Sequence, residues 1–497
     1  MISILQQAQK NSQNTAIIDA TGSYTYQQLL TKSLQIASYL QHQASFQQGD
    51  RVNFLAQPSF AYTTLLLGIW QAGGIAVPMC ITHPTAELQY VLEDTGCKVL
   101  ITDKQYYVKA KALAEQVDIQ IIQYDAIENI NTSLAFQPSS DGNALMIYTS
   151  GTTGKPKGVV TTHRNIESQI KTLVEAWRWS KEDSILHVLP LHHVHGIINV
   201  LACALWSGAR CDFLTKFEAK TVWQLFIDRA YSLFMAVPTI YSRLIQEYEQ
   251  SDNYVQQQMR KATQAMRLMV SGSAALPVTV LEKWENITSH TLLERYGMTE
   301  IGMALSNPYI GKRVAGYVGL PLPGVAIKLV DEQGDEVAQG EPGEIIVKGD
   351  SIFKEYWQRE EATQNAFMQG WFKTGDIAQV NEEGYFKILG RQSVDIIKTG
   401  GYKVSALEIE EVLRTHPAIK ECAVVGIENE EWGEVVSAAI QLHTQASLSL
   451  SQLRDWAKTL LAAYKIPRNL LIVEELPRNA MGKIVKPSVK YLFQENK

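Results

Sequence analysis

Cysteine is scarce in this sequence, and none of the cysteines is paired. The 497 residues contain five cysteines and no C-x-x-C spacing. An odd, unpaired set argues against a disulfide framework and against a zinc site built from cysteine pairs, and it favours a reducing compartment. We therefore expect neither disulfide bonds nor metal binding through thiolates.

The sequence also lacks an excess of basic residues. Its formal net charge is −6 and its pI is about 6.0. Proteins that bind nucleic acids usually carry a basic surface, so we expect no nucleic-acid partner. A local binding site for phosphate is compatible with this composition.

Targeting signals and long apolar runs are absent as well. The N-terminus has neither the apolar centre of a signal peptide nor the arginine-rich character of a transit peptide. The most apolar stretch, Tyr62 to Cys80, is interrupted by Gln71 and three glycines, which favours a buried helix and strand over a membrane span. We expect a cytoplasmic protein without stable membrane insertion, and the sequence leaves homo-oligomerisation open.

Helical and strand patterns alternate through most of the chain, which is typical of an α/β fold. Helices are expected at residues 26–41 and 62–72. Short apolar runs predict buried strands, most naturally in a parallel sheet, at residues 51–55, 75–78, 99–102, 119–123 and 144–148.

The predicted secondary-structure pattern changes at two points, and each change indicates a further subdomain or domain. From about Gly324, turn residues between apolar runs indicate a small β-rich subdomain. After Gly390 the pattern predicts helices at 405–415 and 449–461 and a strand at 422–425. We predict a large α/β N-terminal domain at 1–389 that includes the β-rich subdomain, a hinge at 390–394, and a smaller mobile α+β C-terminal domain at 395–497.

The most informative segment is YTSGTTGKPKG, residues 148–158, which follows an apolar run. Its eleven residues include three glycines, four Ser/Thr hydroxyls and two lysines. Glycines let the backbone approach an anion, hydroxyls donate hydrogen bonds, and lysines supply positive charge. The segment therefore predicts a phosphate site, but not a Walker loop, because Lys155 is followed by Pro156 instead of Ser or Thr.

This segment resembles the phosphate-binding signature of the acyl-adenylate-forming superfamily, which includes the acyl-CoA synthetases. Further motifs follow in that family's order along nearly the whole chain: LPLHHVHG from Leu189, SGSAAL from Ser271, ERYGMTE from Glu294, TGD from Thr374, GRQSVDIIKTGGYKV from Gly390 and PRNAMGK from Pro477. The resemblance implies an ATP-dependent acid:CoA ligase that forms an acyl-adenylate and then an acyl-CoA, using ATP, Mg²⁺ and coenzyme A.

The resemblance also assigns roles to residues. Glu300 is expected to bind Mg²⁺, because a hard cation prefers carboxylate oxygens, and Thr299 to contact the α-phosphate. Lys483 is expected to reach the α-phosphate and acyl oxygens, and His193 to gate the acyl pocket. The remaining ATP-binding set is Thr149, Ser150, Gly151, Thr152, Thr153, Gly154, Lys155, Lys157, Ser273, Arg295, Tyr296, Asp376 and Arg391.

The ribose, adenine and coenzyme A sites follow from the same resemblance. Asp376 is expected to accept hydrogen bonds from both ribose hydroxyls, with Arg391 as a second ribose partner and Tyr296 stacked on adenine. After adenylation the C-terminal domain is expected to rotate and to build a coenzyme A channel against Gly400, Gly401 and Tyr402. One departure from the family is Ser393 at the hinge, where Asp or Lys is usual.

The finer pattern resembles the malonyl-CoA synthetases, especially their mitochondrial type, and implies malonate or methylmalonate as the acid. A dicarboxylate needs a second recognition site, because its unreactive carboxylate must be paired in a desolvated pocket. The expected acid ligands are His195, Arg243, Ser271 and Arg313. Each arginine could equally lie on the surface, and His195 could be an ordinary core histidine.

Other functions stay open at this point. They are a medium-chain or other short acyl-CoA synthetase, an adenylation enzyme that loads a carrier protein, a luciferase-like oxidative enzyme, and a non-enzymatic nucleotide sensor. A sensor is expected to have lost catalytic groups, whereas Glu300, Asp376 and Lys483 are all present.

Overall fold

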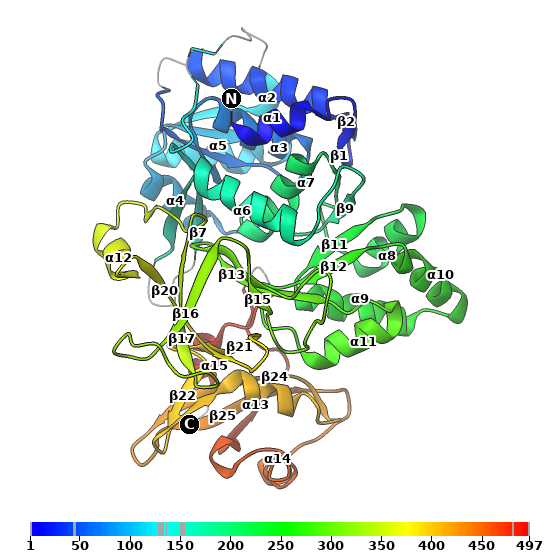
Figure 1. Cartoon of the computed structure of the whole chain (residues 1–497), viewed down its shortest axis with the longest axis vertical. Coiled ribbons are helices and arrows are strands. Elements are labelled where there is room, and N and C mark those ends of the chain that lie inside the picture. The colour runs from blue at the N-terminus through cyan, green and yellow to red at the C-terminus, as the bar shows by residue number, and fades with distance from the viewer. Residues whose placement is uncertain are drawn as a thin grey trace.

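The computed structural model describes residues 2–42, 46–127, 134–135, 137–149, 155–479 and 482–495. In these ranges two large mixed sheets and a smaller antiparallel sheet build an N-terminal body, and a further sheet builds a smaller C-terminal body (Figure 1). The predicted α/β class, with a large first unit and a smaller second one, is confirmed.

One large sheet carries the end of the predicted phosphate segment. Its strand order is β18 (Glu355–Tyr356), β8 (Lys157–Thr162), β7 (Asn143–Thr149), β4 (Ile75–Pro78), β3 (Arg51–Leu55), β5 (Val99–Thr102) and β6 (Gln120–Gln123). The strands from β7 to β6 are parallel, as their apolar runs predicted, but β7 pairs with β8 in the antiparallel direction. The sheet is thus mixed and not purely parallel.

The second large sheet carries most of the acyl-site motifs. Its order is β15 (Leu320–Pro321), β14 (Gly302–Ser306), β13 (Leu293–Met298), β12 (Leu268–Ser271), β11 (Leu233–Ala236), β9 (Ser184–His187), β10 (Arg210–Phe213), β1 (Thr15–Asp19) and β2 (Gly22–Thr25). Strands β13, β12, β11, β9, β10 and β1 are parallel neighbours, so the residues that follow β12 and β13 emerge at one edge of the sheet.

Helices cover these sheets. Those of the N-terminal body are α1 (Ser3–Gln9), α2 (Tyr26–His42), α3 (Phe60–Gln71), α4 (Thr85–Thr95), α5 (Tyr107–Val117), α6 (His163–Ala176), the π-helical segment η3 (His195–Ala202), α7 (Cys203–Ser207), α8 (Ala219–Asp228), α9 (Pro238–Gln250), α10 (Asn253–Gln264), α11 (Val278–Thr288) and α12 (Glu360–Asn365). Short 3₁₀ turns are η1 (Lys104–Tyr106) and η2 (Tyr124–Ala126). Helix α3 is buried nearly all round, which explains its largely apolar sequence.

The small antiparallel sheet contains β16 (Val325–Val330), β17 (Gly343–Gly349), β20 (Trp371–Val380), β19 (Phe367–Met368) and β21 (Phe386–Arg391). The C-terminal body contains β23 (Tyr402–Ser405), β22 (Ile396–Thr399), β25 (Gly433–Leu442), β24 (Ile419–Asn429) and β26 (Asn469–Ile472), with α13 (Ala406–Leu413), α14 (Leu450–Ala457), η4 (Ala463–Lys465) and α15 (Lys486–Glu495). Strand β21 ends at Arg391, so the chain passes from one body to the other there.

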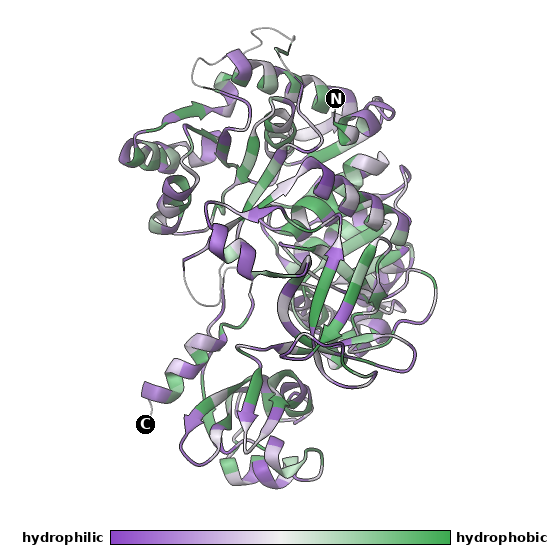
Figure 2. Ribbon diagram, turned by 60° about the vertical axis from the view of Figure 1, so that its left-hand side comes forward, coloured by the Kyte–Doolittle hydropathy of each residue, from purple (hydrophilic) through white to green (hydrophobic). Residues whose placement is uncertain are grey.

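The two bodies have separate cores. Buried apolar side chains of the C-terminal body form clusters whose members all lie at or beyond Ile397. In Figure 2 the apolar colour follows the strands, and the polar colour follows loops and outer helix faces. Among the described helices, none combines the length and the apolar character needed to cross a membrane.

Candidate nucleotide and acyl site

Asp376 lies at the centre of the predicted ribose site. It is on β20 and faces Arg391 across the β20–β21 pair, where the Arg391 Nε donates to its Oδ1 at 3.1 Å. The Tyr296 hydroxyl, at the end of β13, donates to its Oδ2 at 2.6 Å. Three predicted nucleotide residues from different motifs therefore meet at one buried carboxylate.

Glu300 lies beside this group, in the turn between β13 and β14. Its side chain is buried, and its Oε1 accepts a hydrogen bond of 2.9 Å from the Tyr356 hydroxyl. Burial raises the pKa of Glu300, while the hydrogen bond from Tyr356 and the charge of Arg391 lower it. A buried carboxylate next to the Thr299 hydroxyl is a donor set that fits a hard divalent cation.

Lys157 is connected to Glu300 through Tyr356. The Lys157 Nζ lies 5.0 Å from the centre of the Tyr356 ring, and β18 holds Tyr356 opposite Val159 of β8. An open cleft of about 470 Å³ is lined by Lys157 and Tyr356 together with Glu361, Ala362, Asn365 and Ala366. Tyr356 thus contacts both the end of the phosphate segment and the expected Mg²⁺ ligand.

The rest of the phosphate segment is described only at its ends. Thr149 pairs with Lys157 across β7 and β8, and the exposed Lys155 has its Nζ 5.4 Å from the Tyr90 ring centre. Ser150, Gly151, Thr152, Thr153 and Gly154 lie outside the described residues.

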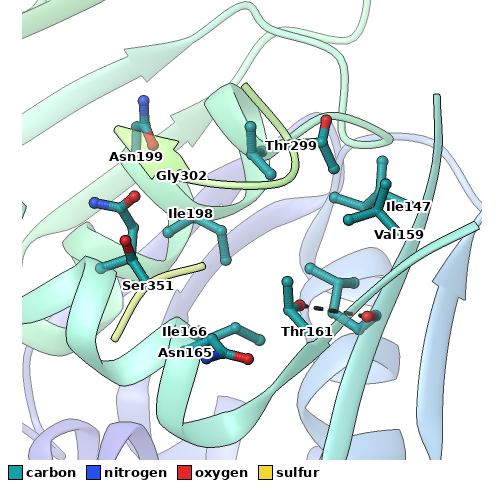
Figure 3. Close-up of a pocket in the computed structure, with 13 residues that line it drawn as sticks. Ile147, Val159, Thr161, Asn165, Ile166, Ile198, Asn199, Thr299, Gly302 and Ser351 are labelled. Carbon is teal, nitrogen blue, oxygen red and sulfur yellow. Dashed lines mark hydrogen bonds between the residues drawn. The ribbon is translucent and has the colours of Figure 1, made fainter. Parts of the chain in front are cut away.

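Thr299 borders a small cavity of about 20 Å³ (Figure 3). The wall opposite the strands β7 and β8 includes Asn199, from the π-helical segment η3, whose two side-chain polar atoms have no partner among the described residues. This volume suits a single ordered water, which could satisfy the Asn199 amide. The π-helical segment therefore brings a polar group close behind the expected α-phosphate contact.

A second buried polar cluster forms where β12 and β13 end. Ser273 adopts a left-handed backbone with φ of +71°, and its Oγ lies 3.1 Å from His195 Nδ1 and 3.5 Å from an Arg295 terminal nitrogen. A Cβ at Gly272 would lie 2.6 Å from the Arg295 guanidinium carbon, so glycine makes room for the arginine.

This cluster holds polar groups without protein partners. Among the described residues, His195 Nε2, Arg295 Nε and the Ser271 hydroxyl are buried and unpartnered. Burial lowers the pKa of Arg295 to about 9, and burial together with the Arg295 charge lowers the pKa of His195 well below its ordinary value. A charged guanidinium beside a neutral imidazole, both with free nitrogens, is suited to bind an anion.

Arg313 does not join this cluster. Its guanidinium donates to the main-chain carbonyls of Pro308 (3.2 Å), Tyr309 (3.1 Å) and Thr291. These contacts occupy its donors and brace the loop after β14. The geometry therefore argues against the predicted role of Arg313 as an acid ligand.

Arg243 lies on α9, and the turn that ends at Lys483 contacts the same helix. Arg243 is exposed on α9, one helical turn after Thr239 and so on the same face. A Cβ at Gly482 would lie 3.5 Å from the Thr239 hydroxyl, so the turn that ends at Lys483 contacts the start of α9. The C-terminal turn thus reaches the N-terminal body, and its lysine is exposed there.

His193 lies at the entrance to η3. Its carbonyl accepts from Ile197, and its ring centre is 4.1 Å from that of His192. Burial lowers the pKa of His193 to about 4, so the imidazole is neutral at physiological pH. A neutral ring is compatible with the predicted gate of the acyl pocket.

The predicted coenzyme A residues lie in the exposed turn between β22 and β23. Gly400 and Gly401 have left-handed φ values of +54° and +84°, and Tyr402 stacks on Tyr464 with ring centres 4.2 Å apart. The adjacent Lys403 pairs with Glu332 in the loop after β16, at 2.7 Å.

A buried charge network anchors the hinge. The Lys486 ammonium lies 2.6 Å from an Asp395 oxygen and 2.8 Å from a Glu410 oxygen. The other Asp395 oxygen accepts from the Arg391 amide at 3.0 Å. Ser393, where this sequence departs from the family, is exposed. The hinge residue that pairs with Lys486 is Asp395.

Residues 4–357 match the family of AMP-binding enzymes, and residues 408–483 match the AMP-binding enzyme C-terminal domain. The chain belongs to the AMP-binding enzyme family. It is 46% identical over 99% of its length to malonate–CoA ligase ACSF3, mitochondrial, from Xenopus laevis, of which it covers 92%. The resemblance to acyl-CoA synthetases is confirmed, and this family member is an AMP-forming acid–CoA ligase.

Solved structures of one relative distinguish two arrangements. ATP-bound MatB from Rhodopseudomonas palustris is 33% identical over the whole of both chains, with a TM-score of 0.92. Apo MatB from the same organism has the same identity and coverage but a TM-score of 0.82. The arrangement of this AMP-binding enzyme is therefore more similar to the ATP-bound relative.

Proposed function

We propose that this enzyme ligates malonate, or its methyl derivative, to coenzyme A. The observation that carries the proposal is the buried cluster of Arg295, His195 and Ser273, in which nitrogens lack a protein partner. The proposal thereby reassigns Arg295 and Ser273, which the sequence predicted for the ATP site, to the acid. A dicarboxylate offers one carboxylate for adenylation and a second that requires such a partner. The similarity to a malonate–CoA ligase over nearly the whole chain supports the same substrate.

In the first half-reaction the chain's charges serve to bring two anions together. Asp376 and Arg391 hold the ribose, and Lys155 and Lys157 face the phosphates. Glu300 would hold Mg²⁺, which when bound would neutralise phosphate charge. Lys483, delivered by the C-terminal turn against α9, stabilises the charge that develops as the acid oxygen attacks the α-phosphate and pyrophosphate leaves.

The second half-reaction needs a different arrangement. In the arrangement that the structure shows, the Lys483 turn contacts α9, whereas Lys403, next to Tyr402, pairs with Glu332. We propose that residues 390–394 are the hinge between domains at 1–389 and 395–497. Rotation about this hinge withdraws the Lys483 turn from α9 and brings the turn with Tyr402 to the acyl site in its place. The coenzyme A thiol then attacks the acyl carbon, and AMP leaves.

An acid panel tests the substrate. Malonate, methylmalonate, acetate and octanoate are compared by kcat/KM for coenzyme A thioester formation, and malonate or methylmalonate should lead. Arg295→Gln should lower kcat/KM for malonate by at least about 30-fold, because a buried carboxylate loses its charged partner, with a smaller effect on acetate. Preference for octanoate, or an equal loss with every acid, would overturn the proposal.

Arg313→Ala is the matched control. Because its guanidinium braces main-chain carbonyls, its loss should lower thermal stability and affect all acids alike. Transfer of the acyl group to a carrier protein but not to free coenzyme A would favour the carrier-loading alternative. The cytoplasmic location and any homo-oligomer stay predictions, and the Xenopus relative is named as mitochondrial.

A further inference from the structure

Three side chains outside the catalytic groups converge beside the acyl site. Cys80 and His83 lie in the segment between β4 and α4, and His192 precedes η3. One potential ligand atom of each, a sulfur and two imidazole nitrogens, lies within 4.8 Å of the others. Cys80 is buried and the two histidines are partly buried, so the group is shielded but reachable.

The segment that carries Cys80 and His83 is fixed by its surroundings. The Lys109 ammonium donates to the carbonyl of His83 at 2.7 Å and lies 3.5 Å from that of Ile81. The Cys80 sulfur lies 3.2 Å from the Thr82 hydroxyl. These contacts hold the backbone in place, so little ordering is needed when a ligand binds.

Glu87 is positioned to orient His83. Its carboxylate lies 3.1 Å from His83 Nδ1. Histidines that bind metals typically have one ring nitrogen held by a carboxylate, which fixes the ring and makes the other nitrogen a better ligand. Glu87 also adds a negative charge close to the cluster.

We propose that Cys80, His83 and His192 bind a zinc ion, contrary to the expectation from cysteine spacing, because two of the three ligands are histidines that the structure brings to a single cysteine. Thiolate and imidazole ligands select zinc over Mg²⁺ and Ca²⁺, which prefer oxygen. Three protein ligands leave a fourth coordination position open to water or a small anion. Binding releases the Cys80 proton to solvent, because the thiolate is the ligand.

Zinc here would join two segments at the acyl site. The His192 ring centre is 5.8 Å from that of His83 and 4.1 Å from that of His193, the predicted gate. A metal bound to His192 would therefore restrict the segment that carries His193. The three proposed ligands do not include Glu300, and the proposal does not depend on which acid is ligated.

Cobalt titration of the full chain tests the site. Co²⁺ should bind with one equivalent and give the ultraviolet absorption of a thiolate–cobalt bond, and Zn²⁺ should displace it. Cys80→Ser should abolish this absorption, and His83→Ala should weaken binding. Cys97→Ser and His443→Ala, which alter a buried cysteine and an exposed histidine elsewhere, should bind as the unaltered chain does.

Glu87→Gln tests orientation, because a lost partner of a ligating histidine should weaken metal binding roughly 10- to 100-fold without removing the absorption. Thermal melting of each variant without metal checks its folding. If Cys80→Ser does not fold, His83→Ala, at a partly exposed position, decides the matter. No thiolate absorption in the unaltered chain, or full affinity in His83→Ala, would overturn the proposal.

Discussion

Glu294 and Arg295 are neighbours on β13, and burial shifts the pKa of each side chain in the direction that favours its uncharged form. The pKa of Glu294 rises to about 8 and that of Arg295 falls to about 9. Successive strand residues point to opposite faces, so Arg295 faces the His195 cluster while Glu294 points away from it. Only Arg295 is thus placed to meet a substrate anion.

Glu294 should make stability depend on pH. The unfolded chain releases its proton near the ordinary value of 4.5, but the folded chain keeps it to about 8. Between these values the folded state binds more protons, so its stability should fall by about 1.4 kcal/mol per pH unit as pH rises. Glu294→Gln should remove this slope in urea unfolding measured from pH 5 to pH 9, and an unchanged slope would contradict the assignment.

Lys483→Ala should separate the two half-reactions. We expect acid-dependent pyrophosphate release to fall by about 10²- to 10³-fold, because a charge that stabilises the transition state is lost. Thioester formation from supplied acyl-adenylate should persist. Lys490→Ala, on the same C-terminal segment with its ammonium 3.5 Å from Glu434, is the control and should leave both steps intact. Equal loss of both steps would refute the role of Lys483.

The structure brings together several residues that sequence motifs predicted for the nucleotide, whereas the predicted acid ligands do not all meet. Asp376, Arg391 and Tyr296 each lie in a short motif and meet in space. The donor to Glu300, Tyr356, was missed, because it lies in a two-residue strand without a motif. Arg313 was assigned by position alone, and a guanidinium taken up by carbonyls cannot be foreseen from the sequence.

At the scale of elements, the buried strands were the most predictable feature. The predicted bounds of β3, β4 and β5 match the structure, because short apolar runs between turns leave little choice of element. Strand β8, which begins eight positions after β7 ends and pairs with it in the antiparallel direction, was not predicted. Its first residues were interpreted only as part of the phosphate segment.

Gly390, near the end of β21, leaves no room for a side chain because Asp395 packs against it. Its φ is +128°, and a Cβ there would lie 2.3 Å from the Asp395 Cβ. Gly390→Ala should therefore displace Asp395, lower the melting temperature and slow both half-reactions. Gly370→Ala, where φ is +80° and no atom lies within 4 Å of the added Cβ, is the control and should incur only the backbone strain, about 1–3 kcal/mol. Equal melting temperatures for the two variants would contradict this account.

At the scale of the whole molecule, the C-terminal turn contacts the N-terminal body, as the proposed adenylation step requires. The Lys483 turn contacts α9, and the Gly400–Gly401 turn lies on the outside, near Glu332. The higher similarity to the ATP-bound relative agrees with this view. Under the proposed rotation, the C-terminal body moves before the thioester forms.

A chemical cross-link should trap this arrangement. Glu332→Cys and Lys403→Cys place reactive thiols at an exposed contact, while the five natural cysteines are buried. Joining the pair with a bismaleimide should preserve pyrophosphate release but block thioester formation. The same double variant without the reagent should complete both steps. A cross-linked enzyme that makes thioester at the normal rate would rule out the rotation.

The ion network of Lys486 has a consequence for sequence variation. Its ammonium is buried against Asp395 and Glu410, so replacing Lys486 leaves these two carboxylates without the cation between them, a loss of about 3–5 kcal/mol. Homologous chains should therefore exchange these residues together or retain them together. The hinge and the segment of the catalytic turn, nearly a hundred positions apart in the sequence, would then covary among homologues.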